Sequence, residues 1–393
     1  MKRIERSLVS LLRRRLAKGP SWIQIVVGPR QVGKTTAVEQ VLERWPGPSL
    51  YASADLPSPP DSFWIQSQWQ AARQKAKSER KKALLVLDEV QKVPRWADVV
   101  KACVDEDRRD KHAVRSVVLG SASLHVQKSA EESLAGRFEL HYCSHWSWPE
   151  CRAAFKWSLD QWLFYGGYPG AAALVRQPTR WGHYITSSLV ESVLSRDVLQ
   201  LTPVAKPALL RQLYRLATHH PAQILSYNKM LGQLQDAGNT VTLAHYLDLL
   251  SSAYLISGLN LWSGGIARQR ASSPKLVTWN NALLNSWPGH AYPATRNAPD
   301  LWGRLVENAV GGYLLNQLPG ESLYYWRDGD LEVDYVLERA GKVLALEVKS
   351  GRAGRVGGLA AFQKRYPHAK ALIVGTGGIP LEQFFSTSPS DWF

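Results

Sequence analysis

The chain has 393 residues, of which 45% are hydrophobic, and carries a formal net charge of +15. Its length exceeds that of a usual single domain, so we expect two or three domains. No apolar run approaches the roughly 20 residues of a membrane-spanning helix, and the basic start MKRIERSLVSLLRRRL lacks the apolar core of a secretory signal. These features argue against a membrane protein and predict a cytoplasmic globular protein with no membrane partner.

The positive charge is unevenly distributed along the chain. Residues 1–159 contain 27 Lys and Arg against 17 Asp and Glu, residues 160–299 contain 11 against 5, and residues 300–393 contain 10 against 11. A basic surface of this size attracts polyanions, of which nucleic acid is the commonest in the cytosol. We therefore expect DNA as a partner. A basic surface that only keeps the protein soluble is the alternative.

A phosphate-binding motif follows an apolar segment near the start of the chain. Residues 23–27 predict a buried strand, and the sequence from Gly28 to Thr35, GPRQVGKT, has the spacing G-x-x-x-x-G-K-(S/T) and runs into a helical pattern. Gly28 and Gly33 let the backbone curl so that its N–H groups point at phosphate oxygens. Lys34 would neutralise the β- and γ-phosphates, and Thr35 would give a hydroxyl ligand to Mg²⁺. The motif predicts an ATP site, with a purely structural glycine turn as the alternative.

Two acidic residues end a second predicted strand. Residues 83–87 are apolar and lead directly into Asp88 and Glu89. Asp88 would hold Mg²⁺ through water and Glu89 would act as the general base on the attacking water, whereas an acidic loop without a catalytic role is the alternative. We expect the magnesium ligands to be Thr35 and Asp88. The predicted nucleotide-binding residues are Gly28, Pro29, Arg30, Gln31, Val32, Gly33, Lys34, Thr35, Thr36 and Asp88.

Two further residues are candidates for catalytic roles. A third predicted strand, residues 116–119, leads into small polar residues, of which Ser121 is the predicted sensor of the γ-phosphate. Arg137 lies just before the next predicted strand, a suitable position for an arginine finger that reaches the ATP of a neighbouring subunit. An arginine paired within its own subunit is the alternative. A finger acting between subunits predicts a homo-oligomer, with six subunits as the expected ring.

The motifs GPRQVGKTT, LLVLDEVQKVP, VVLGSASL and LAGRF are followed by YGGYP, SRDVL, GRLVEN, YYWRD, EVDYVLE and LEVKSG. Together they resemble the bacterial and archaeal AAA-family ATPases that carry a C-terminal region of the DUF4143 type. The resemblance spans nearly the whole chain and implies an ATPase. The chain departs from the family pattern in the stretch LVTWNNALL, where Asn280 stands at a position usually held by aspartate.

The middle of the chain predicts two helical segments. Residues 161–201 are helical around a YGGYPG turn, as in a small lid over the nucleotide. Residues 206–262 predict three helices and a strand, the winged-helix arrangement. The third helix offers only His245 as a cationic group, so any DNA contact would fall on the backbone. A winged helix that binds a protein is the alternative. The expected DNA contacts are Arg268, Arg270 and Lys275.

The C-terminal segment predicts the element order of a PD-(D/E)xK nuclease-like fold. A helix at 301–315 is followed by strands at 322–326, 332–338 and 342–348, a helix at 359–366 and a strand at 370–374. These elements would carry two carboxylates for metal ions and a lysine that orients water. An inactive, structural module is the alternative, because the segment is not basic. The candidate residues are Glu307, Asp334, Glu347 and Lys349.

Together these segments predict an α/β protein with three domains. Residues 1–155 would form a P-loop AAA+ ATPase core, residues 156–270 a helical lid and winged-helix domain, and residues 271–393 the nuclease-like domain. The predicted function is an ATP-hydrolysing motor that acts on duplex or branched DNA, with ATP and Mg²⁺ as cofactors. A regulatory switch that binds a protein partner and an ATP-gated metal-dependent nuclease are the alternatives.

Overall fold

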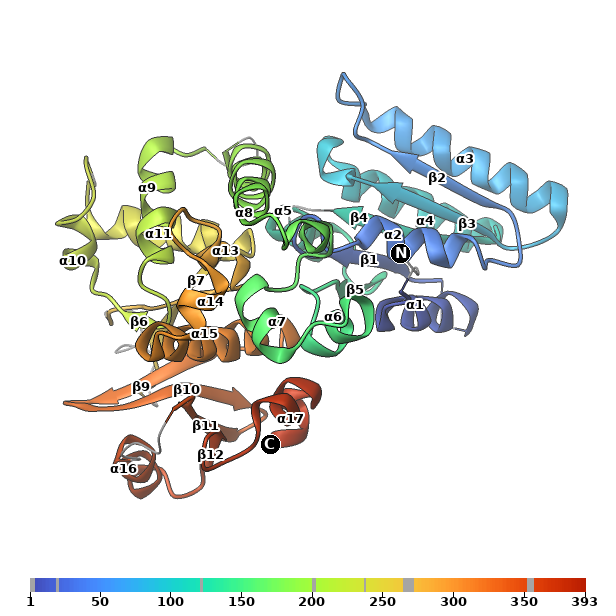
Figure 1. Ribbon diagram of the computed structural model, residues 1–393. Helices are drawn as coiled ribbons and strands as arrows, with labels where there is room; N and C mark the ends of the chain where they lie inside the picture. The colour runs from blue at the N-terminus through green and yellow to red at the C-terminus, as the bar shows by residue number, and fades with distance from the viewer. Residues whose placement is uncertain are drawn as a thin grey trace. The chain divides into compact units, whose positions relative to one another are not determined.

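The computed structural model describes residues 4–18, 21–120, 123–199, 203–236, 238–263, 272–351 and 357–393 (Figure 1). The chain divides into two compact units, Met1–Ser144 (unit 1) and His145–Phe393 (unit 2). Within the described segments, no helix is long and apolar enough to cross a membrane.

Unit 1 is an α/β fold built on a five-stranded, fully parallel sheet in the order β2-β3-β4-β1-β5. The predicted strands at 23–27, 83–87 and 116–119 are confirmed as β1, β3 and β4. The elements are α1 (Ser7–Lys18), β1 (Ile23–Val27), α2 (Lys34–Leu42), β2 (Ser49–Ser53), α3 (Ser62–Glu79), β3 (Ala83–Asp88), a 3₁₀ turn (Val90–Lys92), α4 (Trp96–Asp110), β4 (Val114–Gly120), α5 (Ser123–Ser133) and β5 (Phe138–Tyr142).

Helices cover both faces of this sheet, so its central strands β1, β3 and β4 are buried along their whole length. Alternate residues of a strand face opposite sides. Ile25 of β1 therefore joins the core with α3, α4 and α5, while Val26 joins the core with α1 and α2. All five residues of β1 and all six of β3 are buried.

The parallel topology separates two groups of residues at opposite edges of the sheet. The P-loop follows β1, and Asp88 ends β3, so both lie at the carboxyl edge. Arg137 precedes β5, and its carbonyl accepts a hydrogen bond from Ile23 N at the start of β1. Arg137 is thus at the amino edge, about 16 Å from the P-loop for a five-residue strand.

Unit 2 combines helices with a seven-stranded mixed sheet in the order β12-β11-β10-β9-β7-β8-β6. Its N-terminal elements are α6 (Trp148–Phe155), α7 (Leu159–Tyr165), a 3₁₀ helix (Pro169–Leu174), α8 (Pro178–His183), two π-helical segments (Tyr184–Val190 and Val193–Leu199), α9 (Pro207–Thr218), β6 (Gln223–Ile224), α10 (Tyr227–Leu231), α11 (Thr240–Ser252), β7 (Ile256–Leu261) and β8 (Lys275–Thr278). The remaining elements are α13 (Ala282–Asn285), α14 (Tyr292–Arg296), α15 (Pro299–Gln317), β9 (Leu323–Asp328), β10 (Leu331–Arg339), β11 (Lys342–Lys349), α16 (Gly357–Arg365), β12 (Lys370–Gly375), α17 (Leu381–Ser386) and a 3₁₀ turn (Pro389–Trp392).

The predicted helices and strands of unit 2 are present, and one sheet connects the two segments predicted as separate domains. The three predicted helices of the middle segment are α9, α10 and α11, and the C-terminal helix and strand order is that of α15 to β12. The predicted boundary at 270/271 falls between β7 and β8, which pair antiparallel. Strand β7 also pairs parallel with β9, at Asn260 and Tyr324. One sheet therefore joins the two segments into a single unit.

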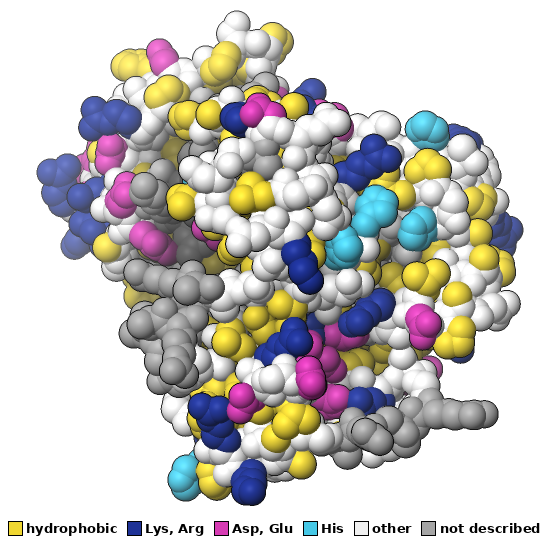
Figure 2. Space-filling model, turned by 90° about the vertical axis from the view of Figure 1, so that its left-hand side faces the viewer, with side chains coloured by type: hydrophobic (Ala, Val, Ile, Leu, Met, Phe, Trp, Pro, Cys, Tyr) yellow, Lys and Arg dark blue, Asp and Glu magenta, His cyan; other side chains and the backbone are white. Residues whose placement is uncertain are grey.

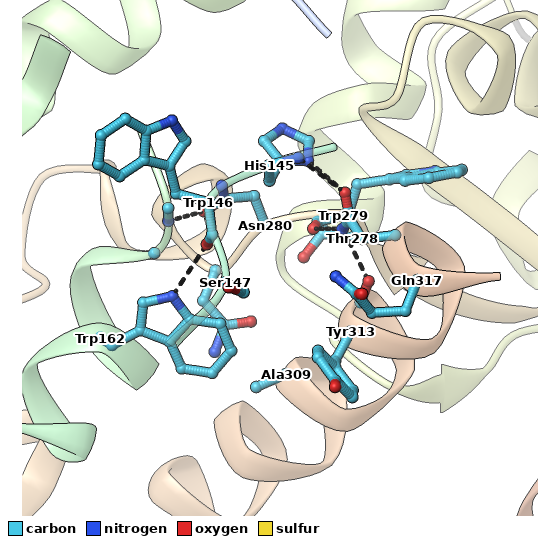
Figure 3. A pocket seen from close by; sticks show the side chains of 15 residues that line it. His145, Trp146, Ser147, Trp162, Thr278, Trp279, Asn280, Ala309, Tyr313 and Gln317 are labelled. Carbon is cyan, nitrogen blue, oxygen red and sulfur yellow. Dashed lines mark hydrogen bonds between the residues drawn. The ribbon is translucent and has the colours of Figure 1, made fainter. Parts of the chain in front are cut away.

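Asn280 lies in a small cavity where the YGGYPG turn meets the helices of unit 2 (Figure 3). Its Oδ1 accepts hydrogen bonds from Gly167 N at 3.2 Å and from Ala282 N at 3.0 Å. A Cβ on Gly166 would come 1.8 Å from this oxygen. The cavity holds about 30 Å³, room for little more than a water molecule. Asn280 thus has a structural role as the acceptor of two backbone N–H groups.

Candidate active site

The P-loop folds as the motif requires. Gly28 has φ of 148° and a Cβ there would lie 2.2 Å from Cys143 O, so only glycine fits. Gly33 has φ of 89°, and Gln31 also takes a left-handed conformation, with φ of 59°. Lys34 Nζ donates to Gly28 O at 2.9 Å and to Pro29 O at 2.8 Å. The lysine ammonium is therefore held inside the curl of the loop, where phosphate oxygens bind in such motifs.

The remaining predicted loop residues take ordinary places around this curl. Val32 is fully buried and anchors the loop in the core shared with α1 and α2. Arg30 is half-buried, and Thr36 is exposed in the first turn of α2. The first turn of α2 contains no acidic residue, so the positive end of the helix dipole is available to an anion.

The structure brings Thr35 and Asp88 together although they are 53 positions apart. Thr35 Oγ1 lies 3.2 Å from Asp88 Oδ2. A hydroxyl and a carboxylate are the oxygen ligands that Mg²⁺ prefers, so these residues fit a nucleotide-bound magnesium ion.

Tyr51 also belongs to this group, and sequence reasoning missed it. Its hydroxyl donates to Asp88 Oδ2 at 2.5 Å. Burial, together with the neighbouring carboxylate of Asp88, raises the pKa of Tyr51 above its usual value, so the phenol stays protonated and keeps donating. The position of Tyr51 in the sheet could have indicated this contact, because Tyr51 lies on β2, the neighbour of β3.

Glu89 has an unusual backbone conformation, with φ of 52°. Such conformations cost energy and cluster at functional sites. Its backbone N–H donates to Asp88 Oδ1 at 2.8 Å, and its Oε2 accepts from Gln91 Nε2 at 2.5 Å. This arrangement orients a partly exposed carboxylate beside Asp88. Ser121, the predicted sensor, lies outside the described residues, directly after the end of β4.

Arg137 binds a carboxylate of its own chain. Its Nε and Nη2 atoms donate to the two oxygens of Asp105 at 2.8 and 3.2 Å, and its Nη1 donates to Ala135 O at 3.2 Å. Hydrogen bonding to Asp105 raises the pKa of Arg137 above its usual value. At the amino edge of the sheet, Arg137 is remote from the P-loop of its own chain.

Unit 2 contains a cluster of carboxylates around a buried lysine. Lys275 on β8 is fully buried, and its Nζ lies 2.7 Å from Glu307 Oε1, 3.0 Å from Glu332 Oε1 and 3.3 Å from Asp334 Oδ1. Its Nζ is also 5.1 Å from the ring centroid of Tyr335. Burial lowers the pKa of Lys275, but the charges of the carboxylates outweigh burial and hold the pKa well above its usual value. The lysine is therefore charged.

The predicted nuclease-like residues converge on the same cluster. Strand β10 is irregular between Val333 and Val336 in its pairing with β9, and Asp334 lies within this irregular stretch. Asp334 Oδ2 accepts a hydrogen bond from Val348 N at 2.8 Å. Lys349 Nζ lies 2.6 Å from Glu347 Oε1.

Two carboxyl groups of the cluster hold their protons more tightly than usual. Burial and the nearby charge of Asp334 raise the pKa of Glu307 to about 7, against the opposing charge of Lys275. Burial and Asp334 also raise the pKa of Glu347. Carboxylate oxygens of Glu307, Glu332 and Asp334 all lie within 4.8 Å of one another, the spacing of a cation site, and the Lys275 ammonium pairs with all three.

The predicted DNA contact at Lys275 is wrong. Lys275 is fully buried, because β8 lies between β7 and β6 in the sheet and directs the side chain at three carboxylates, whereas a DNA contact requires an exposed side chain. Arg268 and Arg270 lie outside the described residues. Sequence reasoning also missed Glu332, which the two-residue spacing from Asp334 along one strand could have indicated.

Comparison with protein families divides the chain into three matched segments. Residues 21–151 match the family model described as "AAA domain", and residues 302–385 match "Domain of unknown function (DUF4143)". Residues 156–291 match "Domain of unknown function (DUF8612)". The resemblance to AAA-type P-loop ATPases with a C-terminal DUF4143 region is therefore confirmed.

Similar proteins have also been found in curated sequences and solved structures. "Uncharacterized protein Rv2008c" of Mycobacterium tuberculosis and "Uncharacterized protein Mb2031c" of Mycobacterium bovis are each 29% identical over 350 residues, which cover 88% of this chain and 73% of the relative. The Walker-type ATPase Paby2304 of Pyrococcus abyssi aligns with a TM-score of 0.49 and 11% identity, over 72% of this chain and 95% of that protein. The Aeropyrum pernix ORC1 protein in complex with DNA aligns with a TM-score of 0.32 and 12% identity, over 68% and 87% of the two chains.

Proposed function

We propose that this chain, in which an AAA domain precedes a DUF4143 domain, is a cytoplasmic AAA+ protein that hydrolyses ATP and uses this energy to act on DNA. One observation above all supports ATP hydrolysis, the 3.2 Å contact between Thr35 Oγ1 and Asp88 Oδ2. This contact joins the P-loop to a carboxylate from another strand, as magnesium-dependent phosphoryl transfer requires.

Each residue of the site has a defined role in the proposed reaction. Lys34 exchanges its contacts with loop carbonyls for the β- and γ-phosphates, and the N–H groups of the loop hold the remaining phosphate oxygens. Glu89 accepts a proton from the attacking water. Ser121 contacts the γ-phosphate as the predicted sensor. Mg²⁺, when bound, neutralises negative charge that develops on the phosphates.

The proposal includes an oligomer in which Arg137 acts between subunits. Arg137 precedes β5 at the amino edge of the sheet, so it cannot reach the nucleotide of its own chain. Its bidentate pair with Asp105 holds the guanidinium ready at the surface, and a neighbouring phosphate would replace this carboxylate. A head-to-tail contact repeated around an axis closes a ring, and a hexamer is the ring we propose.

Support for DNA as the partner comes from the formal net charge of +15 and from the topology of unit 2. Elements α9, β6, α10, α11, β7 and β8 follow one another in the order of a winged helix. The exposed face of α11 presents Val241, His245 and Asp248, which offers no arginine or lysine for reading base edges. On the face shown in Figure 2, Lys and Arg side chains lie beside Asp and Glu side chains. We therefore propose that the protein binds the DNA backbone and selects DNA by shape rather than by sequence.

The composition of α11 favours a second candidate function, a regulatory switch in which this helix binds a protein. Val241 is 74% exposed, and Asp248 on the same face would repel phosphate groups. Apolar and mixed-charge side chains suit a protein surface better than a DNA groove.

The third candidate, an ATP-gated nuclease, is disfavoured by Lys275. Its ammonium pairs with the carboxylates of Glu307 and Asp334 that would otherwise ligate metal ions. We infer that this cluster stabilises unit 2 and does not cleave DNA.

An ATPase assay across a panel of DNA structures tests the proposal. We expect duplex, forked or four-way-junction DNA to raise the rate of ATP turnover, and we expect binding to weaken steeply as salt rises. ATP turnover that is independent of DNA, together with no salt-dependent DNA binding, would exclude the DNA role. If purification with the tagged chain then returns a stable protein partner that alters turnover, the switch is the better account.

A further inference from the structure

We infer that a groove in unit 1, between α1 and the starts of β2 and β3, binds the phosphate backbone of DNA. The inference rests on the proposed DNA function and assigns it a site that the sequence did not predict. The groove has a volume of about 1260 Å³, larger than the roughly 300–1,000 Å³ of typical small-molecule pockets. Its size suits a polymer. Its cationic residues include Arg13, Arg14, Lys18, Arg44, Lys81 and Lys82.

Most cations of the groove have no carboxylate partner among the described residues. Among its described lining residues there is no Asp or Glu. Two of the lining cations are paired: Arg44 with Glu5, and Arg15 with Glu139 at 3.6 Å. The side chains of Arg14, Lys81 and Lys82 are exposed, and none of them forms an ion pair with a described residue. Cations that lie close together without counter-charges repel one another. Binding of a polyanion here relieves this repulsion and is therefore favourable.

Three separate segments contribute these cations, so the dipole of a single helix cannot account for all of them. Basic residues near the end of α1 are favourable for the helix dipole, and this effect accounts for Arg15 and Lys18. It does not account for Arg44 after α2 or for Lys81 and Lys82 before β3. Trp45 Nε1 donates to Lys82 O at 2.9 Å. This bond fixes two of the segments to each other and keeps the cations of the groove together.

The apolar face of α1 is already used for packing. Leu8, Val9, Leu12 and Leu16 are buried in the core that α1 shares with α2. Membrane-surface helices bind by inserting such a face into lipid, and here the face is not available. Because this face is buried, the groove is better suited to nucleic acid than to a lipid surface as its polyanion.

The groove is linked by continuous elements to the nucleotide site. Strand β3 begins directly after Lys82 and ends at Asp88, and α2 runs from Lys34 of the P-loop to the groove. The groove thus lies at the amino edge of the sheet, and DNA bound there leaves the nucleotide site at the carboxyl edge accessible.

The test compares the full chain with the double variant Lys81→Ala, Lys82→Ala in binding to a fluorescently labelled duplex at several salt concentrations. The matched control is Arg108→Ala, Arg109→Ala, which removes two exposed cations of α4 in the same unit. We expect the groove variant to bind about tenfold more weakly, and its plot of log affinity against log salt to be about 1.8 units shallower, since each phosphate contact contributes about 0.9. The control should match the parent, and an unchanged thermal midpoint shows that the variant is folded.

The outcomes separate this inference from the proposed function. If the parent chain binds no DNA, the DNA function fails and the inference fails with it. If the parent binds DNA and the groove variant binds with the same affinity and salt slope, the groove inference alone is overturned. A third result would be that the parent chain binds phosphatidylserine vesicles and the groove variant does not, with DNA binding unchanged in both. This result would overturn the groove inference in favour of a lipid partner.

Discussion

Tyr51 donates a hydrogen bond to Asp88 Oδ2, the same carboxylate oxygen that accepts from Thr35. Two donors occupy both lone pairs of this oxygen. A water bound to Mg²⁺ would also donate to Asp88, so the tyrosine hydroxyl would compete with it for Oδ2.

Tyr51→Phe is expected to remove this competition without disturbing the fold, because only one hydroxyl is lost and Tyr51 is 40% exposed. We predict that the variant reaches half-maximal ATP turnover at a Mg²⁺ concentration about tenfold lower than the parent, since a hydrogen bond to a charged group contributes about 1.5–3 kcal/mol net. A magnesium titration of the steady-state rate measures this. An unchanged or higher magnesium requirement would show that Tyr51 instead helps to position Asp88.

Arg137→Ala is expected to lower ATP turnover by about 10³-fold, as loss of an arginine finger does. Asp105→Ala removes the resting partner of Arg137 and should retain turnover. The decisive measurement mixes Arg137→Ala with Lys34→Ala subunits, each inactive alone. Recovery of activity on mixing is predicted, because an intact P-loop in one subunit then meets an intact Arg137 from another. A mixture as inactive as its components would contradict action between subunits.

Lys275→Ala is expected to lower the free energy of unfolding by about 3–5 kcal/mol, because it leaves three carboxylates without their buried counter-charge. Urea denaturation measures the loss. Lys342→Ala, which removes an exposed lysine on β11, is the control and should change stability by less than about 0.5 kcal/mol.

A second readout follows from the same substitution. Without the ammonium, the carboxylates can bind a metal ion, so Mn²⁺ should raise the thermal midpoint of Lys275→Ala more than that of the parent. Equal effects of Mn²⁺ on both proteins would argue against Lys275 as the resident cation, as would cleavage of DNA by the parent that Asp334→Ala abolishes.

The raised pKa of Glu307 predicts the direction of a pH effect. Burial favours the protonated form in the folded state, so the folded protein binds this proton more tightly than the unfolded chain. The stabilising contribution is full below about pH 4.5 and is lost as pH rises through about 7. Glu347 has a shift of the same sign, so Glu307→Gln should reduce this decline without abolishing it. Urea denaturation at several pH values measures this decline. The assignment would be refuted if the stabilities of the parent and of Glu307→Gln fell equally as pH rises.

The nucleotide site could be predicted because its signals are local. A strand, a glycine loop and a helix follow one another from Ile23 to Leu42, and Asp88 and Glu89 directly follow an apolar run. Tyr51 could not be placed, because its contact with Asp88 depends on the order of strands in the sheet.

Unit 2 shows a second limit of sequence reasoning. Its helices and strands were predicted, but the pairing of β7 with β9 joins residues more than 60 positions apart, and nothing local indicates it. Lysine is normally exposed, so Lys275 was taken for a surface residue. Its position at the start of an apolar strand argued against an exposed side chain. The three carboxylates make burial of the charged lysine possible.

Turnover by Glu89→Gln tests the central claim most directly. The account predicts that this variant binds ATP as tightly as the parent and hydrolyses it at least about 10²-fold more slowly, whereas Lys34→Ala fails to bind ATP. Binding of a fluorescent ATP analogue and release of phosphate, measured on the same preparations, separate the two effects. Hydrolysis by Glu89→Gln at the rate of the parent would contradict the assignment of Glu89 as the general base and the mechanism built on it.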